Sequence, residues 1–292
     1  MNAAAAGNPQ HTPHSRGRGR SPLTTPGALR VPEVALAFWV VKLLSTAMGE
    51  STSDALVNSS LGAPVAVVLG FAAFLAALFI QFKQARYRAW SYWLAVCGVG
   101  VFGTMAADVM HVVLHVPYTA SSIFYAILLA AVFISWSRIE NTLSIHSIDT
   151  PRREGFYWAA VVATFAMGTA LGDFTANTLK LGYWPSAALF AGIILIPLIG
   201  WRLLRWNTVF CFWAAYVVTR PLGASIADGL GKPKNVSGMG IGDGPVAGVL
   251  VVLIVALVAY LAVSKSDVQK SPTREQSAPG WTDEQDLTRV RG

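Results

Sequence analysis

The sequence contains little charge. Asp, Glu, Lys and Arg make up 13% of its 292 residues, whereas hydrophobic residues make up 54%. A soluble domain carries about 25% charged residues. Several apolar runs approach or exceed the roughly 18 to 20 residues that a helix needs to cross a bilayer. The composition therefore excludes an ordinary soluble domain and predicts an all-α integral membrane protein surrounded by lipid.

Cysteine and catalytic motifs are also scarce. Cys97 and Cys211 both fall inside apolar segments, which excludes a disulfide framework. The sequence has no His-Glu-x-x-His, no Gly-x-Ser-x-Gly and no cysteine cluster, and its glycine-rich run 238–244 lacks the Lys-Ser/Thr of a phosphate loop. We therefore expect neither enzyme activity nor a cofactor, with an intramembrane metal-dependent enzyme as a weaker alternative.

What the chain does have is a unit repeated four times. In each copy a Trp preceded by Phe or Tyr is followed ten residues later by Gly and fifteen residues later by Asp. The four sets are Trp39, Gly49 and Asp54; Trp93, Gly103 and Asp108; Trp158, Gly168 and Asp173; and Trp213, Gly223 and Asp228. Such self-similarity indicates an array of equivalent structural units.

The repeats correspond to four hairpins of two transmembrane helices each. The predicted spans are 33–57, 65–82, 90–113, 119–137, 156–178, 186–204, 208–230 and 245–263. We divide the chain into repeats at 31–88, 89–153, 154–206 and 207–263, all with the same topology. The polar segments 1–30 and 264–292 cannot bury enough apolar surface to order themselves, so we expect both to be disordered tails.

Basic residues predict the orientation. Seventeen of the 22 Lys and Arg residues lie on the side of both termini, and three, Lys180, Lys232 and Lys234, lie in the opposite loops. The positive-inside rule therefore places both termini in the cytoplasm. The net charge of +7 arises from these flanking residues, so we do not expect nucleic acid as a partner. The sequence leaves the oligomeric state open.

The aromatic-Trp opening, the central Gly, the late acid and the four two-helix units together resemble a known bacterial family. It is the family of four tandem membrane repeats of unknown function, uncharacterised membrane-anchored proteins. The resemblance covers about residues 31–263 and implies the architecture and a place in a bacterial inner membrane. It implies no activity, so function has to be argued from the residues.

The polar residues of the Trp-bearing helices fall on one face. Positions three, seven, eleven and fifteen after each Trp follow the i, i+4 ridge of a helix. In the first repeat they are Lys42, Thr46, Glu50 and Asp54, and in the fourth they include Arg220 and Asp228. Such a face should point into the bundle, because charge facing lipid is costly. We expect four carboxylates near the outer end, Glu50 one turn deeper, and Lys42 and Arg220 deeper still.

Intramembrane acids are typical of cation pathways and proton relays. The sequence therefore predicts a secondary transporter or channel for a small cation, with a divalent metal and proton coupling as open variants. The predicted pathway residues are Lys42, Glu50, Asp54, Asp108, Asp173, Arg220 and Asp228. The alternative is a scaffold or sensor that transports nothing and whose acids are structural.

A second, weaker site is local to the second repeat. Asp108, His111 and His115 would share one face of an ideal helix, and His with carboxylate suits a transition metal. For the repeated residues we expect structural roles. Small residues let helices approach closely, which makes Gly49, Gly103, Gly168 and Gly223 packing points. Trp39, Trp93, Trp158 and Trp213 are expected to pack or to anchor at the interface.

Overall fold

The computed structural model describes residues 29–269, which form helices and loops without a strand. The eight long helices are α1 (Leu36–Val57), α2 (Ala63–Phe82), α3 (Ala89–Asp108), α4 (Tyr118–Glu140), α5 (Pro151–Asp173), α6 (Tyr183–Leu203), α7 (Thr208–Gly231) and α8 (Asp243–Ser264). Short π-helical turns, η2 (Val109–Val113) and η4 (Phe174–Thr178), extend α3 and α5. The expected all-α architecture is confirmed, and the predicted spans match these eight helices.

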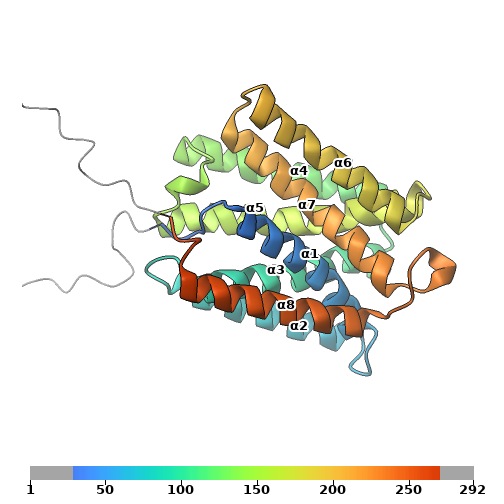
Figure 1. Cartoon of the computed structure of the whole chain (residues 1–292). Coiled ribbons are helices and arrows are strands. Elements are labelled where there is room, and N and C mark those ends of the chain that lie inside the picture. The colour runs from blue at the N-terminus through green and yellow to red at the C-terminus, as the bar shows by residue number, and fades with distance from the viewer. Residues whose placement is uncertain (1–28, 270–292) are drawn as a thin grey trace, which may run out of the picture.

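The odd-numbered helices form a closed ring at the centre. α1 contacts α3, α3 contacts α5, α5 contacts α7, and α7 returns to α1. The even-numbered helices lie outside this ring, and each packs chiefly on the odd helix of the following repeat: α2 on α3, α4 on α5, α6 on α7 and α8 on α1 (Figure 1). The four repeats are therefore interlocked and share one continuous core.

The repeated glycines lie where neighbouring ring helices touch. A Cβ atom added to Gly49 would lie 2.6 Å from the backbone of Gly100 on α3, and one added to Gly103 would lie 2.9 Å from Phe165 on α5. Added to Gly223, it would lie 1.9 Å from the hydroxyl of Thr46 on α1. No side chain fits at these contacts, so the ring can close only because the positions are glycine.

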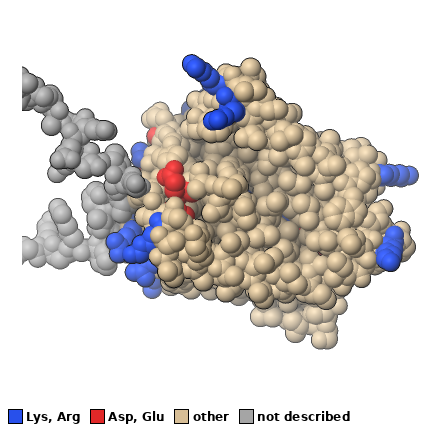
Figure 2. All heavy atoms as spheres, viewed as in Figure 1, with Lys and Arg blue, Asp and Glu red and all other residues tan. Residues whose placement is uncertain are grey.

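Seven of the eight long helices within residues 29–269 are long and apolar enough to cross a membrane. The exception is α1, which carries Lys42, Glu50 and Asp54. It lies in the inner ring and is covered by α8, so its charges need not face lipid. The side of the bundle seen in Figure 2 is a broad uncharged band with charged residues gathered toward its ends. The protein is a multi-pass membrane protein in a lipid environment.

Both described chain ends, Leu29 and Gln269, lie at one end of the bundle, which we name the terminus end; the opposite end is the far end (Figure 1). At the terminus end, Arg30 Nη1 donates a 2.7 Å hydrogen bond to Glu154 Oε2, and Gln81 Nε2 donates one of 3.0 Å to Glu154 Oε1. Arg30 and Glu154 are 3% and 0% exposed. This cluster ties the segment before α1 to α2 and α5.

The packing at the terminus end corrects the predicted boundaries of the tails. Arg30 lies in the segment expected to be disordered, yet it is buried. The same holds after α8, where Asp267 is buried and Gln269 donates a 2.9 Å hydrogen bond to the carbonyl of Pro32. The order comes from these polar contacts, which apolar composition does not reveal. The rest of both predicted tails, 1–28 and 270–292, lies outside the described residues.

Candidate functional site: a polar axis with an acidic mouth

The polar face of each odd helix points into the ring, so its residues form layers across the axis. The layer seven residues after the Trp contains Thr46, Gly100, Phe165 and Arg220, and the next contains Glu50, Thr104, Thr169 and Ala224. Contacts link members of these layers around the ring, including those between Glu50 and Thr104 and between Arg220 and Thr46. Most of these side chains are buried, so the axis is an enclosed polar interior.

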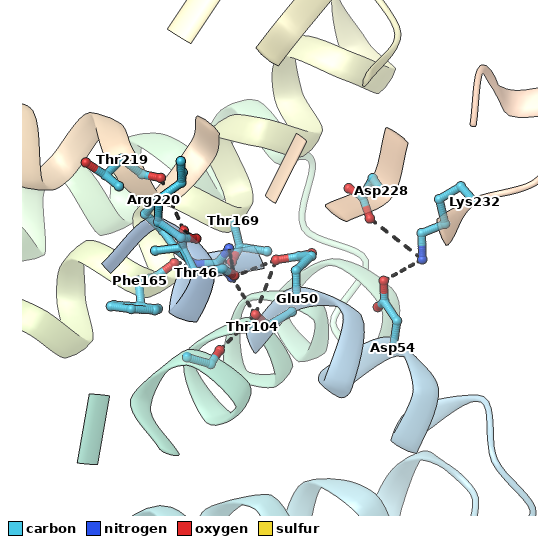
Figure 3. Close-up of polar contacts among 12 residues, drawn as sticks. Thr46, Glu50, Asp54, Thr104, Phe165, Thr169, Thr219, Arg220, Asp228 and Lys232 are labelled. Carbon is cyan, nitrogen blue, oxygen red and sulfur yellow. Dashed lines mark hydrogen bonds and ion pairs between the residues drawn. The ribbon is translucent and has the colours of Figure 1, made fainter. Parts of the chain in front are cut away.

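Arg220 is the centre of this interior (Figure 3). Its Nη2 donates to Glu50 Oε2 at 2.6 Å, to Thr104 Oγ1 at 2.5 Å and to Thr169 Oγ1 at 2.6 Å. Its Nη1 donates to the carbonyl of Thr46 at 3.3 Å. One guanidinium therefore binds all three other ring helices and neutralises Glu50. A buried charge is tolerated only when it is paired and hydrogen-bonded in this way.

The room for Arg220 comes from a repeated glycine. A Cβ atom added to Gly168 on α5 would lie 2.4 Å from Cγ of Arg220. The next residue, Pro221, lies inside α7, but the helix runs without interruption from Thr208 to Gly231. Gly168 is thus both a helix contact and part of the Arg220 site.

A group of acids lies between Arg220 and the far end. Carboxylate oxygens of Glu50, Asp54 and Asp228 all lie within 4.8 Å of one another. Glu50 and Asp228 are buried, whereas the Asp54 side chain is 16% exposed. We name these three residues the acidic mouth. Among the described residues this is the one group of three His, Cys, Asp or Glu side chains placed to hold a metal ion.

Lys232, at the end of α7, already places a positive charge on the acidic mouth. Its Nζ lies 2.5 Å from Asp54 Oδ2, 3.9 Å from Asp228 Oδ1 and 3.5 Å from Asp243 Oδ2. Burial on its own would lower the pKa of Lys232, but Asp54 and Asp228 outweigh it and raise that pKa above its ordinary value. Lys232 is therefore an ammonium tethered where a free cation could bind.

The other two repeated acids stand apart from the acidic mouth. Asp108 and Asp173 interact electrostatically with Glu50 and Asp54 but do not belong to the group of three. Asp173 accepts a 3.4 Å hydrogen bond from Asn177. Both acids lie where their helices widen from α-helix to π-helix. The expected ring of four carboxylates is thus uneven, with two members inside the acidic mouth and two beside it.

The structure does not bring Asp108, His111 and His115 together as three metal ligands. After Asp108 the helix becomes the π-helical turn η2, so the spacing that aligns these residues on an α-helix no longer applies. His111 Nδ1 lies 2.9 Å from the carbonyl of Val116, and its ring stacks on Tyr118 with centroids 3.5 Å apart. His115 is exposed, with a φ of 54°.

Lys42 lies closer to the terminus end than Arg220 does, and its environment is aromatic. Its Nζ is 4.1 Å from the ring centroid of Phe165 and 4.2 Å from that of Tyr216. Lys42 is 0% exposed, and its ammonium has no hydrogen-bond partner within residues 29–269. It therefore differs from Arg220, whose charge has a carboxylate partner.

The four repeated tryptophans surround the axis in the half of the bundle that contains Lys42. Trp93, Trp158 and Trp213 are 1%, 2% and 5% exposed, so they pack in the core, whereas Trp39 is half-buried. Trp213 also donates a 2.9 Å hydrogen bond to the carbonyl of Leu143.

Sequence reasoning did not select several residues of this axis. Thr104, Thr169 and Lys232 all lie on the polar stripe, and their positions there were the available signal. Their roles as hydrogen-bond acceptors of Arg220 and as the cation on the acidic mouth depend on neighbouring helices. The buried Glu154 had no signal beyond being an acid near two arginines in a mostly basic segment.

The comparisons with known proteins agree with the repeat architecture. Four segments of the chain, 37–87, 91–142, 156–205 and 211–267, match the family described as Repeat of Unknown Function (DUF347). No curated protein and no solved structure matches the chain. The four matched segments coincide with the four helix pairs and cover well over half of the sequence. The chain therefore belongs to the DUF347 repeat family.

Proposed function

We propose that this protein is a secondary transporter that carries a small, hard cation, such as a divalent metal ion, through its polar axis in exchange for protons. The observation that carries the proposal is the acidic mouth, where oxygens of Glu50, Asp54 and Asp228 converge within 4.8 Å near one end of a membrane bundle. Carboxylates in the membrane are costly and mark ion pathways. Oxygen ligands without nitrogen or sulfur suit Mg²⁺, Ca²⁺ or Mn²⁺.

The charge balance around the acidic mouth supports a cation as the ligand. Six carboxylates lie at or beside it: Glu50, Asp54, Asp108, Asp173, Asp228 and Asp243. The cations in contact with these acids are Arg220 and Lys232. With every group ionised, the region carries four more negative than positive charges. An added cation would reduce this excess, whereas an anion would increase it.

The pairing within the axis suggests how the cation binds and why the protein is a carrier. Glu50 bonds to Arg220, and Asp54 bonds to Lys232. A cation in the acidic mouth takes over these carboxylates and releases both basic side chains. Beyond Glu50 the axis is filled by Arg220, Phe165 and Lys42, and both basic side chains lie over the ring of Phe165. Passage therefore needs a rearrangement of Arg220, as in a carrier. The positive-inside bias supports an orientation in which the acidic mouth opens to the outer side of the membrane.

Cation binding is tested with Mn²⁺, whose electron paramagnetic resonance signal broadens when the ion is bound. We expect the purified full-length protein to bind Mn²⁺, and we expect Asp54→Asn and Asp228→Asn to weaken binding. Glu33→Gln is the matched control, because Glu33 is a half-exposed acid at the terminus end. Equal Mn²⁺ affinity in the wild type and in both folded Asp variants would contradict the assigned site.

The alternative is a scaffold or sensor that transports nothing, and the pairing of Glu50 and Asp54 with internal cations favours it. This alternative predicts that the same Asn variants lower stability without changing ion flux. To separate the two functions, the thermal unfolding of each variant is measured beside its Mn²⁺ binding. The double variant Glu50→Gln with Arg220→Met removes both charges of the buried pair together. We expect it to fold and to lose Mn²⁺ binding.

A further inference from the structure

Lys42 is a buried basic group that takes no part in the proposed binding of a cation at the acidic mouth. It is fully enclosed, and its Nζ contacts the faces of two aromatic rings, with no hydrogen-bond acceptor among the described residues. Aromatic faces stabilise an ammonium by about 0.5 to 2 kcal/mol. A buried lysine can lose its proton, whereas arginine in effect always keeps its charge. Lys42 is therefore a buried base of the axis that can change its protonation state, whereas Arg220 cannot.

The charged groups around Lys42 make its protonation sensitive to the acidic mouth. From α7, the Tyr216 ring contacts Lys42 and Arg220 lies over the same Phe165 ring as Lys42, while the carboxylate of Glu50 is already bound to Arg220. α8 carries two titratable side chains: Asp243, which lies beside Lys232 near the acidic mouth, and Tyr260, which is 63% exposed and faces away from the axis. A proton on Lys42 therefore adds a second positive charge beside Arg220. A metal ion bound at Glu50 adds a further one, so the metal and the proton should exclude each other.

A file of tyrosines lies between Lys42 and the terminus end. The file consists of Tyr216 on α7, Tyr157 on α5, Tyr92 on α3 and Tyr87 before α3. The Tyr92 and Tyr157 hydroxyls are hydrogen-bonded to each other, and the Tyr87 ring lies 5.7 Å from that of Tyr92. The rings of Tyr157 and Tyr216 both pack on Trp213, at 6.0 and 5.4 Å.

The file ends at an acid of the terminus end. The Tyr87 hydroxyl donates a hydrogen bond to Asp267, which follows α8. Burial raises the pKa of Asp267 above its ordinary value, so this carboxylate takes up a proton more readily than an exposed one. Hydrogen bonds join Tyr92 to Tyr157 and Tyr87 to Asp267, whereas the Tyr216 hydroxyl has no hydrogen-bond partner among the described residues. Passage of a proton from Lys42 to Asp267 therefore requires the Tyr216 hydroxyl to move toward Tyr157.

We propose that Lys42 carries the proton exchanged for the cation and that the tyrosine file conducts this proton to the terminus end. The inference rests on the proposed cation transport and names its coupling residue. When a cation enters the acidic mouth, one N–H bond of the Lys42 ammonium breaks and the proton moves through the hydroxyls to water. The amine stays neutral until the cation leaves, and then takes a proton back from the far end through the acidic mouth, so that one proton crosses the bundle for each cation. No other bond changes.

The first test counts the protons released on binding. Mn²⁺ is added to the full-length protein in weakly buffered detergent solution with a pH indicator, and bound Mn²⁺ is measured in parallel. We expect Lys42→Met to bind Mn²⁺ but to release one proton fewer per ion than the wild type. Lys265→Met, which removes an exposed lysine after α8, is the control and should match the wild type. Equal proton release by Lys42→Met and the wild type overturns the role of Lys42.

The second test keeps Lys42 and interrupts the file, so it decides the question even if Lys42→Met does not fold. Tyr216→Phe retains the ring beside Lys42 and removes the hydroxyl. In proteoliposomes we expect it to lower the rate of Mn²⁺-driven proton movement at least several-fold, with Tyr260→Phe as the exposed control. An unchanged rate overturns the file. Absence of Mn²⁺ binding in the wild type refutes the proposed function and this inference together, whereas binding with unaltered proton release refutes this inference alone.

Discussion

Repeats one and four differ from repeats two and three in the chemistry of the same positions. α1 and α7 contribute Lys42, Glu50 and Arg220 to the polar axis, whereas the matching residues of α3 and α5 are Val, Thr, Gly and Phe. All four repeats keep the aromatic-Trp pair, the glycine and the Asp. The shared residues close the ring, and the charged residues concentrate on two helices that lie side by side. The comparison separates residues that build the fold from residues that we assign to function.

The largest expected effect comes from breaking the pair that joins α1 and α7. Arg220→Met leaves Glu50 buried without its partner, and removing one member of a buried ion pair costs about 3 to 5 kcal/mol. The free energy of unfolding in detergent measures this loss. The double variant with Glu50→Gln should recover most of it. If both variants lose the same stability, the pair is not what makes Arg220 important.

The next effect tests the glycines that all repeats share. Gly168→Ala places a methyl group where Cγ of Arg220 lies, at 2.4 Å, and such overpacking costs about 1 to 3 kcal/mol. Gly192→Ala on α6 is the matched control, because nothing lies within 4 Å of its added Cβ. Alanine is the better helix former by up to about 1 kcal/mol, so the control should be neutral or stabilising. Equal destabilisation by both substitutions would contradict the packing role.

A third prediction compares the repeated acids. Asp54→Asn removes a member of the acidic mouth, whereas Asp108→Asn changes the same position of the second repeat, outside that group. We expect Asp54→Asn to weaken Mn²⁺ binding about tenfold more than Asp108→Asn, a difference of about 1.4 kcal/mol. Titration of both proteins with Mn²⁺ checks this. Equal losses would mean that the four acids act as one symmetric ring.

The smallest expected effect concerns Lys232. Lys232→Met removes the tethered ammonium from Asp54, so Mn²⁺ should bind a few-fold more tightly, in keeping with the roughly 0.2 to 1 kcal/mol of a partly exposed ion pair. Weaker binding would instead make Lys232 a positioning residue for the site.

The pH dependence of stability tests the same ion pair. Because the pKa of Lys232 is raised by folding, its contribution to stability is complete below the unfolded pKa. It disappears only when the pH rises through the higher folded pKa. The stability difference between the wild type and Lys232→Met should therefore stay constant through neutral pH, as measured by thermal unfolding at several pH values.

Much of the fold could be predicted because the signals are local. Apolar runs gave the eight helices, and the Trp, Gly and Asp positions gave the repeats. The start of α5 was placed at 156 but lies at Pro151, where the Thr150 side chain caps the helix by accepting a hydrogen bond from the Arg153 N–H. The packing of each even helix on the following repeat could not be predicted, because no local pattern records which neighbour a lipid-facing helix chooses.

The position of the candidate site could be predicted from the sequence, but the pairing of its charged side chains could not. The i, i+4 stripe put Glu50, Asp54, Arg220 and Asp228 inside the bundle, and the structure brings these four side chains together. That Arg220 would bind Glu50 depends on α1 and α7 being neighbours in the ring. The unexpected feature at Asp108 has a similar cause, since the π-helical turn that follows it disperses the two histidines.

The most direct test of the account is Mn²⁺ uptake into proteoliposomes that contain the full-length protein and are driven by a pH gradient. Asp54→Asn is measured beside the wild type and the control Glu33→Gln, with folding of each protein checked by thermal unfolding. The account predicts uptake by the wild type and the control and strongly reduced uptake by Asp54→Asn. Equal uptake by all three, or none by folded wild-type protein, would contradict cation transport through the acidic mouth.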